Sequence, residues 1–152
     1  MPGRYGWIGG PGSSAYVVPA DGSAPGRRLL AADRKEFTSL PDWSGDRIVV
    51  AGNRLGEGGL WVADVTDPNQ PWDLQARRID AGPSDPISFG WSRWSPDGTT
   101  IATTYVPTGG YGDAMLYSLD SAAPQPLLDD PALDKILPAW SPDGTWLTML
   151  AM

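Results

Sequence analysis

The chain has 152 residues, with 18 acidic and 11 basic side chains and a formal net charge of −7. This length allows one domain with a hydrophobic core, and the scattered acidic side chains argue against nucleic acid or an anionic membrane as a partner. No apolar run approaches the roughly 18 residues of a membrane-spanning helix, so we expect no membrane insertion. The first residues lack the pattern of a signal peptide. The location stays open between the cytoplasm and, if a signal was removed, the periplasm or the exterior.

Cysteine and histidine are both absent from the sequence. The first absence excludes disulfides and thiolate chemistry, and the second removes the commonest general base and the commonest metal ligand. We therefore predict no cofactor, no metal and no catalytic residues, and we expect that the protein is not an enzyme.

Turn-forming residues are abundant, with 19 glycines and 16 prolines, and they are accompanied by eight tryptophans and five tyrosines. Disordered chains are poor in aromatic residues, so this composition indicates a folded domain. Many turns together with many aromatic side chains predict an all-β domain of short strands.

The predicted strands recur in units that cover approximately residues 15–38, 39–85, 86–131 and 132–152 of a single domain, 1–152. The first unit offers two short apolar segments, the second and third offer four each, and the fourth offers two. Segments this short, bounded by Gly, Pro, Asn and Asp, favour strands over helices. Residues 129–137 are expected to form a loop between units.

A six-residue phrase, Trp-Ser-Pro-Asp-Gly-Thr, occurs twice, 46 residues apart, and a shorter Trp-Ser-Gly-Asp copy precedes both. Proline fixes φ in a tight turn, aspartate accepts hydrogen bonds from nearby N–H groups, and glycine permits positive φ. Each Trp would then fill the space between adjacent sheets. We interpret the phrase as a structural repeat motif made of Trp43, Ser44, Trp94, Ser95, Pro96, Asp97, Gly98, Trp140, Ser141, Pro142, Asp143 and Gly144. The less favoured alternative is that its aspartates are metal or catalytic carboxylates.

The phrase, followed by a strand and by the Leu-Tyr-Ser-Leu-Asp of residues 116–120, resembles the PD40 or WD40-like repeat of TolB-type β-propellers. The same repeat is found in the propeller domains of prolyl-oligopeptidase-type peptidases. Two copies match closely, while the copy at Trp43 lacks the proline. The resemblance implies an all-β propeller fragment of about three four-stranded antiparallel blades, and it names no substrate.

The resemblance also raises the question of ring closure, because propellers of this family usually have six or seven blades. The predicted strands begin with the second half of a blade and end with the first half of another. We therefore hypothesise a homodimer in which two copies complete one six-bladed ring. A fragment of a longer protein and a monomeric open arc are the alternatives.

For function, the resemblance favours a non-catalytic binding or scaffold module for a protein or peptide partner. The alternative is a truncated propeller domain of a prolyl-oligopeptidase-like peptidase or another propeller-containing hydrolase. Trp72, Trp91 and Tyr111 lie near predicted turns or strand starts and are the candidates for a binding face. For Trp91, packing between blades is an equal alternative.

Overall fold

The computed structural model describes residues 16–28, 37–38, 41–54, 57–66, 76–80, 88–106, 111–121, 123–128 and 130–152. Within these ranges every regular element is a β-strand, so the all-β prediction is confirmed. The same ranges contain no helix with the length and apolar character needed to cross a membrane.

The first complete sheet is built around two long strands that pair over eight residues. Its strands are β3 (Phe37–Thr38), β4 (Asp42–Ser44), β5 (Arg47–Arg54), β6 (Glu57–Asp64) and β7 (Ala76–Arg78). All pairings are antiparallel, and β3 and β4 both pair with β5, which has β6 on its other edge. The segments β3 and β4 are therefore two halves of one interrupted first strand, and the sheet has the four-stranded order of a propeller blade.

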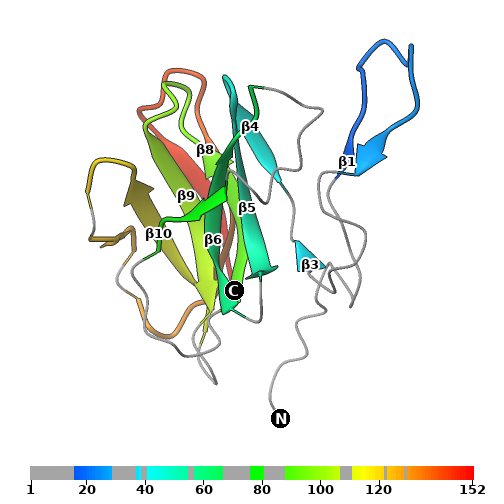
Figure 1. Ribbon diagram of the computed structural model, residues 1–152. Helices are drawn as coiled ribbons and strands as arrows, with labels where there is room; N and C mark the ends of the chain where they lie inside the picture. The colour runs from blue at the N-terminus through cyan, green and yellow to red at the C-terminus, as the bar shows by residue number, and fades with distance from the viewer. Residues whose placement is uncertain are drawn as a thin grey trace.

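The second sheet repeats this order without the interruption. Its strands are β8 (Ser88–Trp94), β9 (Thr100–Val106), β10 (Asp113–Ser118) and β11 (Gln125–Pro126), paired in sequence order. Two further strand pairs flank the two blades, β1 (Tyr16–Val17) with β2 (Arg27–Arg28) and β12 (Lys135–Trp140) with β13 (Leu147–Ala151). Figure 1 shows the two blades stacked against each other, with the β1–β2 hairpin on the side of the first blade that faces away from the second. The loop predicted over residues 129–137 is corrected at its end, because β12 begins at Lys135.

The outer strand pairs of the two blades can be compared residue by residue with the β1–β2 hairpin. These pairs are Trp61 with Arg78 and Val62 with Arg77 in the first blade, Met115 with Pro126 and Leu116 with Gln125 in the second, and Tyr16 with Arg28 and Val17 with Arg27 in the hairpin. In both β6–β7 and β1–β2 an aromatic residue and a valine lie opposite two consecutive arginines, so the β1–β2 hairpin corresponds to the third and fourth strand of a blade.

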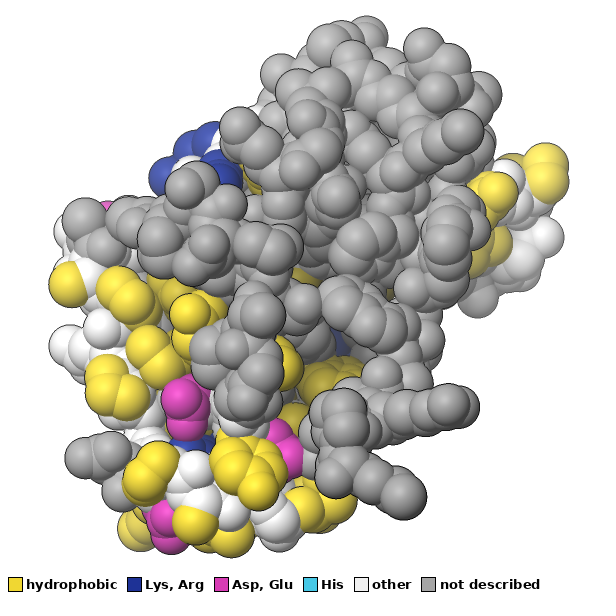
Figure 2. Space-filling view, turned by 90° about the horizontal axis from the view of Figure 1, so that it is seen from below, with side chains coloured by type: hydrophobic (Ala, Val, Ile, Leu, Met, Phe, Trp, Pro, Cys, Tyr) yellow, Lys and Arg dark blue, Asp and Glu magenta, His cyan; other side chains and the backbone are white. Residues whose placement is uncertain are grey.

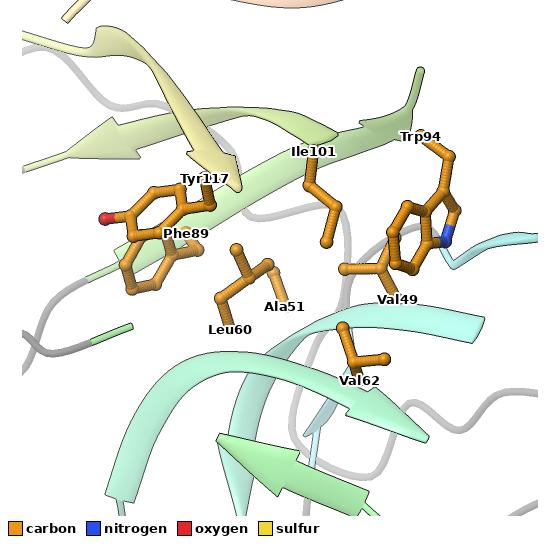
Figure 3. Packing of buried hydrophobic residues seen from close by; sticks show 8 residues of the cluster. All are labelled: Val49, Ala51, Leu60, Val62, Phe89, Trp94, Ile101 and Tyr117. Carbon is orange, nitrogen blue, oxygen red and sulfur yellow. The ribbon is translucent and has the colours of Figure 1, made fainter. Parts of the chain in front are cut away.

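A hydrophobic core fills the space between the two blades, and Figure 3 shows its side chains pointing toward one another from the two sheets. The first blade contributes Val49, Ala51, Leu60 and Val62, and the second contributes Phe89, Trp94, Ile101 and Tyr117. Phe89 and Tyr117 meet edge to face, with ring centroids 5.9 Å apart. Packing of this kind between neighbouring sheets is what stabilises a blade array, because each blade can bury its faces only against its neighbours.

The other face of the first blade has a core of its own. Alternate residues of β5 and β6 point to it, since successive side chains of a strand face opposite sides. This core contains Ile48, Val50, Trp61, Ala63 and Val65, and Val17 of β1 packs against it. The hairpin therefore lies where a preceding blade would lie.

A β-bulge interrupts each first strand at the same position of the repeat. In the second blade the register shifts between Gly90 and Arg93, which leaves one residue more in β8 than in β9. Because of this extra residue Phe89 and Trp94 face the same core, although they are five positions apart and a regular strand would send them to opposite faces. The matching shifts lie between Ile136 and Ala139 in β12 and between β3 and β4 in the first blade.

The buried phenol of Tyr117 makes the stability of this core depend on alkaline pH. Burial raises the pKa of Tyr117 to about 12, and the negative charge of Asp80 adds to the shift. A raised pKa means that the stabilising effect is complete below the unfolded pKa near 10 and is lost as the pH rises from there toward 12. We expect Tyr117→Phe to unfold at the same urea concentration as the parent chain at pH 7 and at a higher one at pH 11. Equal midpoints at pH 11 would contradict the prediction.

Candidate binding surface

The repeated phrase forms the corner between the first and second strands of a blade. In the second blade the N–H of Gly98 donates to the carbonyl oxygen of Ser95 at 2.9 Å, and Gly98 has φ of +68°. The corner of the third unit has the same bond, from Gly144 to Ser141 at 2.9 Å, and Gly144 has φ of +72°. Positive φ is open to glycine at little cost, which explains the residue type at both corners.

The corner aspartates are used within their own turns. One carboxylate oxygen of Asp143 accepts hydrogen bonds from the Ser141 hydroxyl at 2.5 Å, the Thr145 N–H at 3.1 Å and the Thr145 hydroxyl at 2.8 Å. The Ser141 hydroxyl and then the Thr145 N–H lower the pKa of Asp143 to about 2. Asp97 makes the equivalent three bonds, and its pKa is also lowered. Across the part of the chain that the structure describes, no cluster of three or more acidic residues could hold a metal ion.

The shorter corner at Trp43 closes by a different turn. Ser44 pairs directly with Arg47, so two residues form the turn, and the first of them, Gly45, has φ of +56°. Glycine at this position is typical of two-residue hairpin turns. The indole N–H of Trp43 donates to the carbonyl oxygen of Gly45, which holds the ring over its own turn.

Successive corners are joined to one another across the blade boundary. A carboxylate oxygen of Asp42 accepts the N–H of Trp94 at 2.7 Å, and Nη2 of Arg47 donates to the carbonyl oxygen of Gly98 at 2.8 Å. The Arg47 guanidinium also lies 5.1 Å from the centre of the Trp94 ring, within the range of a cation–π contact. In the next unit the indole N–H of Trp140 donates to the carbonyl oxygen of Arg93 at 3.1 Å. The corners therefore fix how each blade sits on the one before it.

The bulges place large apolar residues in an unusual backbone conformation. Trp91 in β8 has φ of +40° and Leu137 in β12 has φ of +56°, and each lies at the bulge of its strand. The two residues are 46 positions apart, the same spacing as that between the corner tryptophans Trp94 and Trp140. Non-glycine residues with positive φ are uncommon and costly, so a recurrence at one repeat position indicates a shared requirement. A bulge re-aims the side chain that it carries.

These bulges lie on neighbouring first strands. The strand β8 is next to β4 on one side and next to β12 on the other. In a propeller the blades surround a central channel, so the strands that converge in this way lie on the channel side. Trp91 is half-buried and Leu137 is 40% exposed, so both can be reached from outside the core. We call Trp91 and Leu137 the bulge row.

The conformation of Leu137 should itself limit stability. A left-handed backbone costs a non-glycine residue about 1–2 kcal/mol, while glycine adds about 0.5–1 kcal/mol of chain entropy to lose. We therefore expect Leu137→Gly to raise the free energy of unfolding by up to about 1 kcal/mol, measured by urea titration. Leu150→Gly is the matched control, because Leu150 is a similarly exposed strand residue without positive φ, and it should lower stability. A loss of stability in both variants would contradict the prediction.

The predicted binding face is only partly assembled by the structure. Trp72 lies outside the described residues. Trp91 is in the bulge of β8, whereas Tyr111 is 55% exposed and precedes β10, at the end of the blade opposite the Trp-Ser corner. The bulge row as a whole was not among the residues predicted from the sequence, although one signal was present: a large apolar residue, Leu40, Trp91 or Leu137, stands three residues before every corner tryptophan.

A buried polar cluster between the second blade and β12 was also missed. The Lys135 side chain is 1% exposed, and its ammonium donates to Asp113 at 2.6 Å and to the carbonyl oxygens of Leu128 at 3.1 Å and Asp130 at 2.6 Å. Asp134, which is also buried, accepts the N–H of Gly112. Because the three donors of the ammonium have three acceptors, Lys135 has a structural role.

Comparisons with known proteins agree with this architecture. No protein-family model matches the sequence. The chain is 32% identical over 119 residues to a protein described as putative tricorn protease homolog 2, from Streptomyces coelicolor, and the match covers 74% of this chain and 9% of that protein. The crystal structure of TolB from Acinetobacter baumannii superposes with a TM-score of 0.66 at 16% sequence identity, over 90% of this chain and 31% of the TolB chain. The chain therefore has the fold of a TolB-like propeller, and it spans only a small part of the length of both proteins.

Proposed function

We propose that this stretch of TolB-like propeller is a non-catalytic binding module that holds a protein or peptide partner against the first strands of its blades. The observation that carries the proposal is the bulge row, in which two neighbouring first strands hold Trp91 and Leu137 at positive φ. Strained residues of this kind persist where the surrounding structure enforces them, and they cluster at binding and catalytic sites.

The chemistry of the bulge row suits a polypeptide partner. An aromatic and an aliphatic side chain on adjacent blades offer two apolar anchors, and exposed aromatic residues are the commonest anchors in protein interfaces. The side chains of a bound segment that alternate toward the row would supply the apolar groups that fill it. We therefore expect bound peptides to contain two or more large apolar residues.

The absence of catalysis in the proposal follows from the residue types. The whole sequence lacks histidine and cysteine. The carboxylates of Asp97 and Asp143 accept hydrogen bonds within their turns, and the pKa of each is lowered. Carboxylates held in this way are poor general bases, because their bonding favours the charged form and lowers its basicity.

A second candidate function is supported by the sequence likeness to a tricorn protease homolog, of which the chain spans 9%. In that case the chain would be the propeller portion of a larger peptidase, and the bulge row would contact substrate on its way to a catalytic domain. A panel of peptide and ester substrates tests the present chain: turnover that survives repurification would overturn the non-catalytic proposal.

Binding is tested by selecting ligands from a displayed peptide library on the purified chain. We expect selected peptides to bind the parent chain and to bind Trp91→Gly at least about tenfold more weakly, since loss of one aromatic anchor typically costs more than about 1.4 kcal/mol. Glycine at this position keeps the positive φ accessible. The matched control is Leu128→Ser, which removes a 44% exposed apolar residue that follows the outermost strand β11 and should leave affinity unchanged. A library that yields no binder, or binders indifferent to Trp91→Gly, would overturn the proposal.

A further inference from the structure

The second strand of the last unit has an edge that the second strands of both blades do not have. The strand β5 pairs with β4 and β6, and β9 pairs with β8 and β10. Among the described residues β13 pairs with β12 alone. An uncovered edge presents a row of unpaired N–H and C=O groups, which is a template for another strand.

The β1–β2 hairpin has the opposite deficiency. Its residue pairs match those of β6 and β7, which assigns it as a third and a fourth strand, and in the described part of the chain these two strands pair only with each other. Val17 packs against the outer core of the first blade, whereas β12 adjoins β8 and β9 of the second blade. The hairpin and β13 therefore lie on opposite sides of the two-blade stack, and the hairpin of one chain does not reach its own β13.

We propose that the β1–β2 hairpin of a second copy pairs with β13, so that two chains complete each other's open blade and close one ring with twofold symmetry. A closed twofold arrangement uses the same pair of surfaces twice, which leaves no edge for further growth. The repeat register then fixes the contacts. Val49 pairs with Val62, and Ala102 with Leu116, so Thr148 should lie opposite Val17 of the partner subunit. By the same register Met149 should lie opposite Tyr16 of the partner subunit.

The exposed side chains of β13 and of the first blade are those that this ring would cover. In β13 the residues Leu147 and Met149 are half-buried, while Leu150 on the other face is 52% exposed. That other face corresponds to the face of β5 that carries Val49 and Ala51, which cover Trp94. Trp94 is 6% exposed, whereas Trp43, which no second strand covers within the described ranges, is 47% exposed. The β13 face of one copy would therefore cover Trp43 of the partner subunit.

The largest exposed side chain lies at the centre of this contact. Trp146 is 74% exposed, and by the repeat it occupies the position of Arg47, whose guanidinium lies over Trp94 of the following blade. In the ring Trp146 would lie in the same way over Trp43 of the partner subunit. Trp146, Trp43 and Leu150 are all large hydrophobic side chains that stay exposed in one chain, and apolar surface of this kind is typical of an interface. The end of the molecule away from the Trp-Ser corners, seen from below in Figure 2, has hydrophobic side chains as well, with a few charged groups among them.

The absence of cysteine from the chain allows a direct test of the register. In the double variant Val17→Cys with Thr148→Cys, opposite positions of adjacent strands should oxidise to a disulfide-linked dimer on a non-reducing gel. The matched control is Val18→Cys with Thr148→Cys, whose side chains face opposite sides of the sheet and should stay monomeric on that gel. Equal cross-linking in both double variants would overturn the register.

The mass of the assembly tests the ring itself. Light scattering on the parent chain should give twice the 16.2 kDa chain mass, and Trp146→Asp should weaken the dimer at least about 100-fold while leaving the folded monomer intact by circular dichroism. A mass of one chain, or a series of masses above two chains, would overturn the proposal. A dimer that is unchanged by Trp146→Asp would also overturn it, because the contact would then lie elsewhere.

Discussion

Trp94→Ala is expected to lower the free energy of unfolding by about 3–5 kcal/mol, the usual cost of deleting a fully buried aromatic side chain. Trp94 is 6% exposed and packs with Val49 and Ile101 in the core between the two blades. Its ring also receives the Arg47 guanidinium. Removal of the ring would leave a cavity at the blade boundary, so the loss of unfolding free energy should exceed the loss expected from the smaller buried apolar area alone. Urea unfolding followed by circular dichroism measures it.

The control for this prediction is the same residue type at the same repeat position. Trp43 is 47% exposed, so Trp43→Ala should cost less than about 1 kcal/mol when it is measured at a concentration too low for the proposed dimer to form. The comparison separates the effect of burial from the effect of the motif. Equal losses in the two variants would show that the tryptophan acts within its own corner and does not stabilise the contact between blades.

Lys135→Met is expected to lower the free energy of unfolding by about 2–4 kcal/mol, although methionine is of similar size and more hydrophobic. The ammonium of Lys135 is the donor to Asp113 and to two main-chain carbonyl groups, of Leu128 and Asp130. Methionine offers no donor, so these acceptors would lose a buried partner. The same variant should loosen the contact between the second blade and β12, which hydrogen exchange of the β12 amides would report.

Asp113→Asn is the matched control for the lysine. The Asp113 side chain is 42% exposed and can be solvated when the ion pair is weakened, so this change should cost less than about 1 kcal/mol. If the two variants lost equal stability, the ion pair would be the main contribution. If Lys135→Met lost nothing, the bonds to the carbonyl groups would have no net effect.

The corners could be predicted from the sequence because their interactions are local. The bonds of Asp97 reach residues two positions away, and the φ of Gly98 is set within one turn. Proline, aspartate and glycine have these properties in any protein. The four-stranded units could be predicted for a related reason, since the turns that separate the strands are also rich in proline, aspartate and glycine.

The environments of the corner tryptophans could not be predicted in the same way. Trp43 and Trp94 are both followed by serine, yet Trp43 is half-exposed and Trp94 is buried, because among the described residues a second strand of another blade lies in front of Trp94 and none lies in front of Trp43. The burial of Lys135 could not be predicted from the sequence either. A lone lysine in a predicted loop is usually solvated, and its burial depends on carbonyl groups that the sequence does not mark.

The bulge could be predicted from the sequence only in part. The recurrence of Leu40, Trp91 and Leu137 three residues before each corner tryptophan can be read from the sequence. The extra residue cannot, because it is defined by the pairing of the first strand with the second. Strand pairing is non-local, and a shift of one residue reverses every side chain beyond it.

This bulge determines where evolution can change the length of the repeat. The corner tryptophans are 51 residues apart between the first two copies and 46 between the last two, so insertions and deletions of several residues are accepted somewhere in the unit. Within the first strand an insertion or deletion is not tolerated, because the number of residues between Phe89 and Trp94 determines that both side chains enter the same core. A deletion of one residue there would send the side chains on one side of the deletion to the opposite face of the sheet, whereas the two units differ by five residues in length and keep the same strand order.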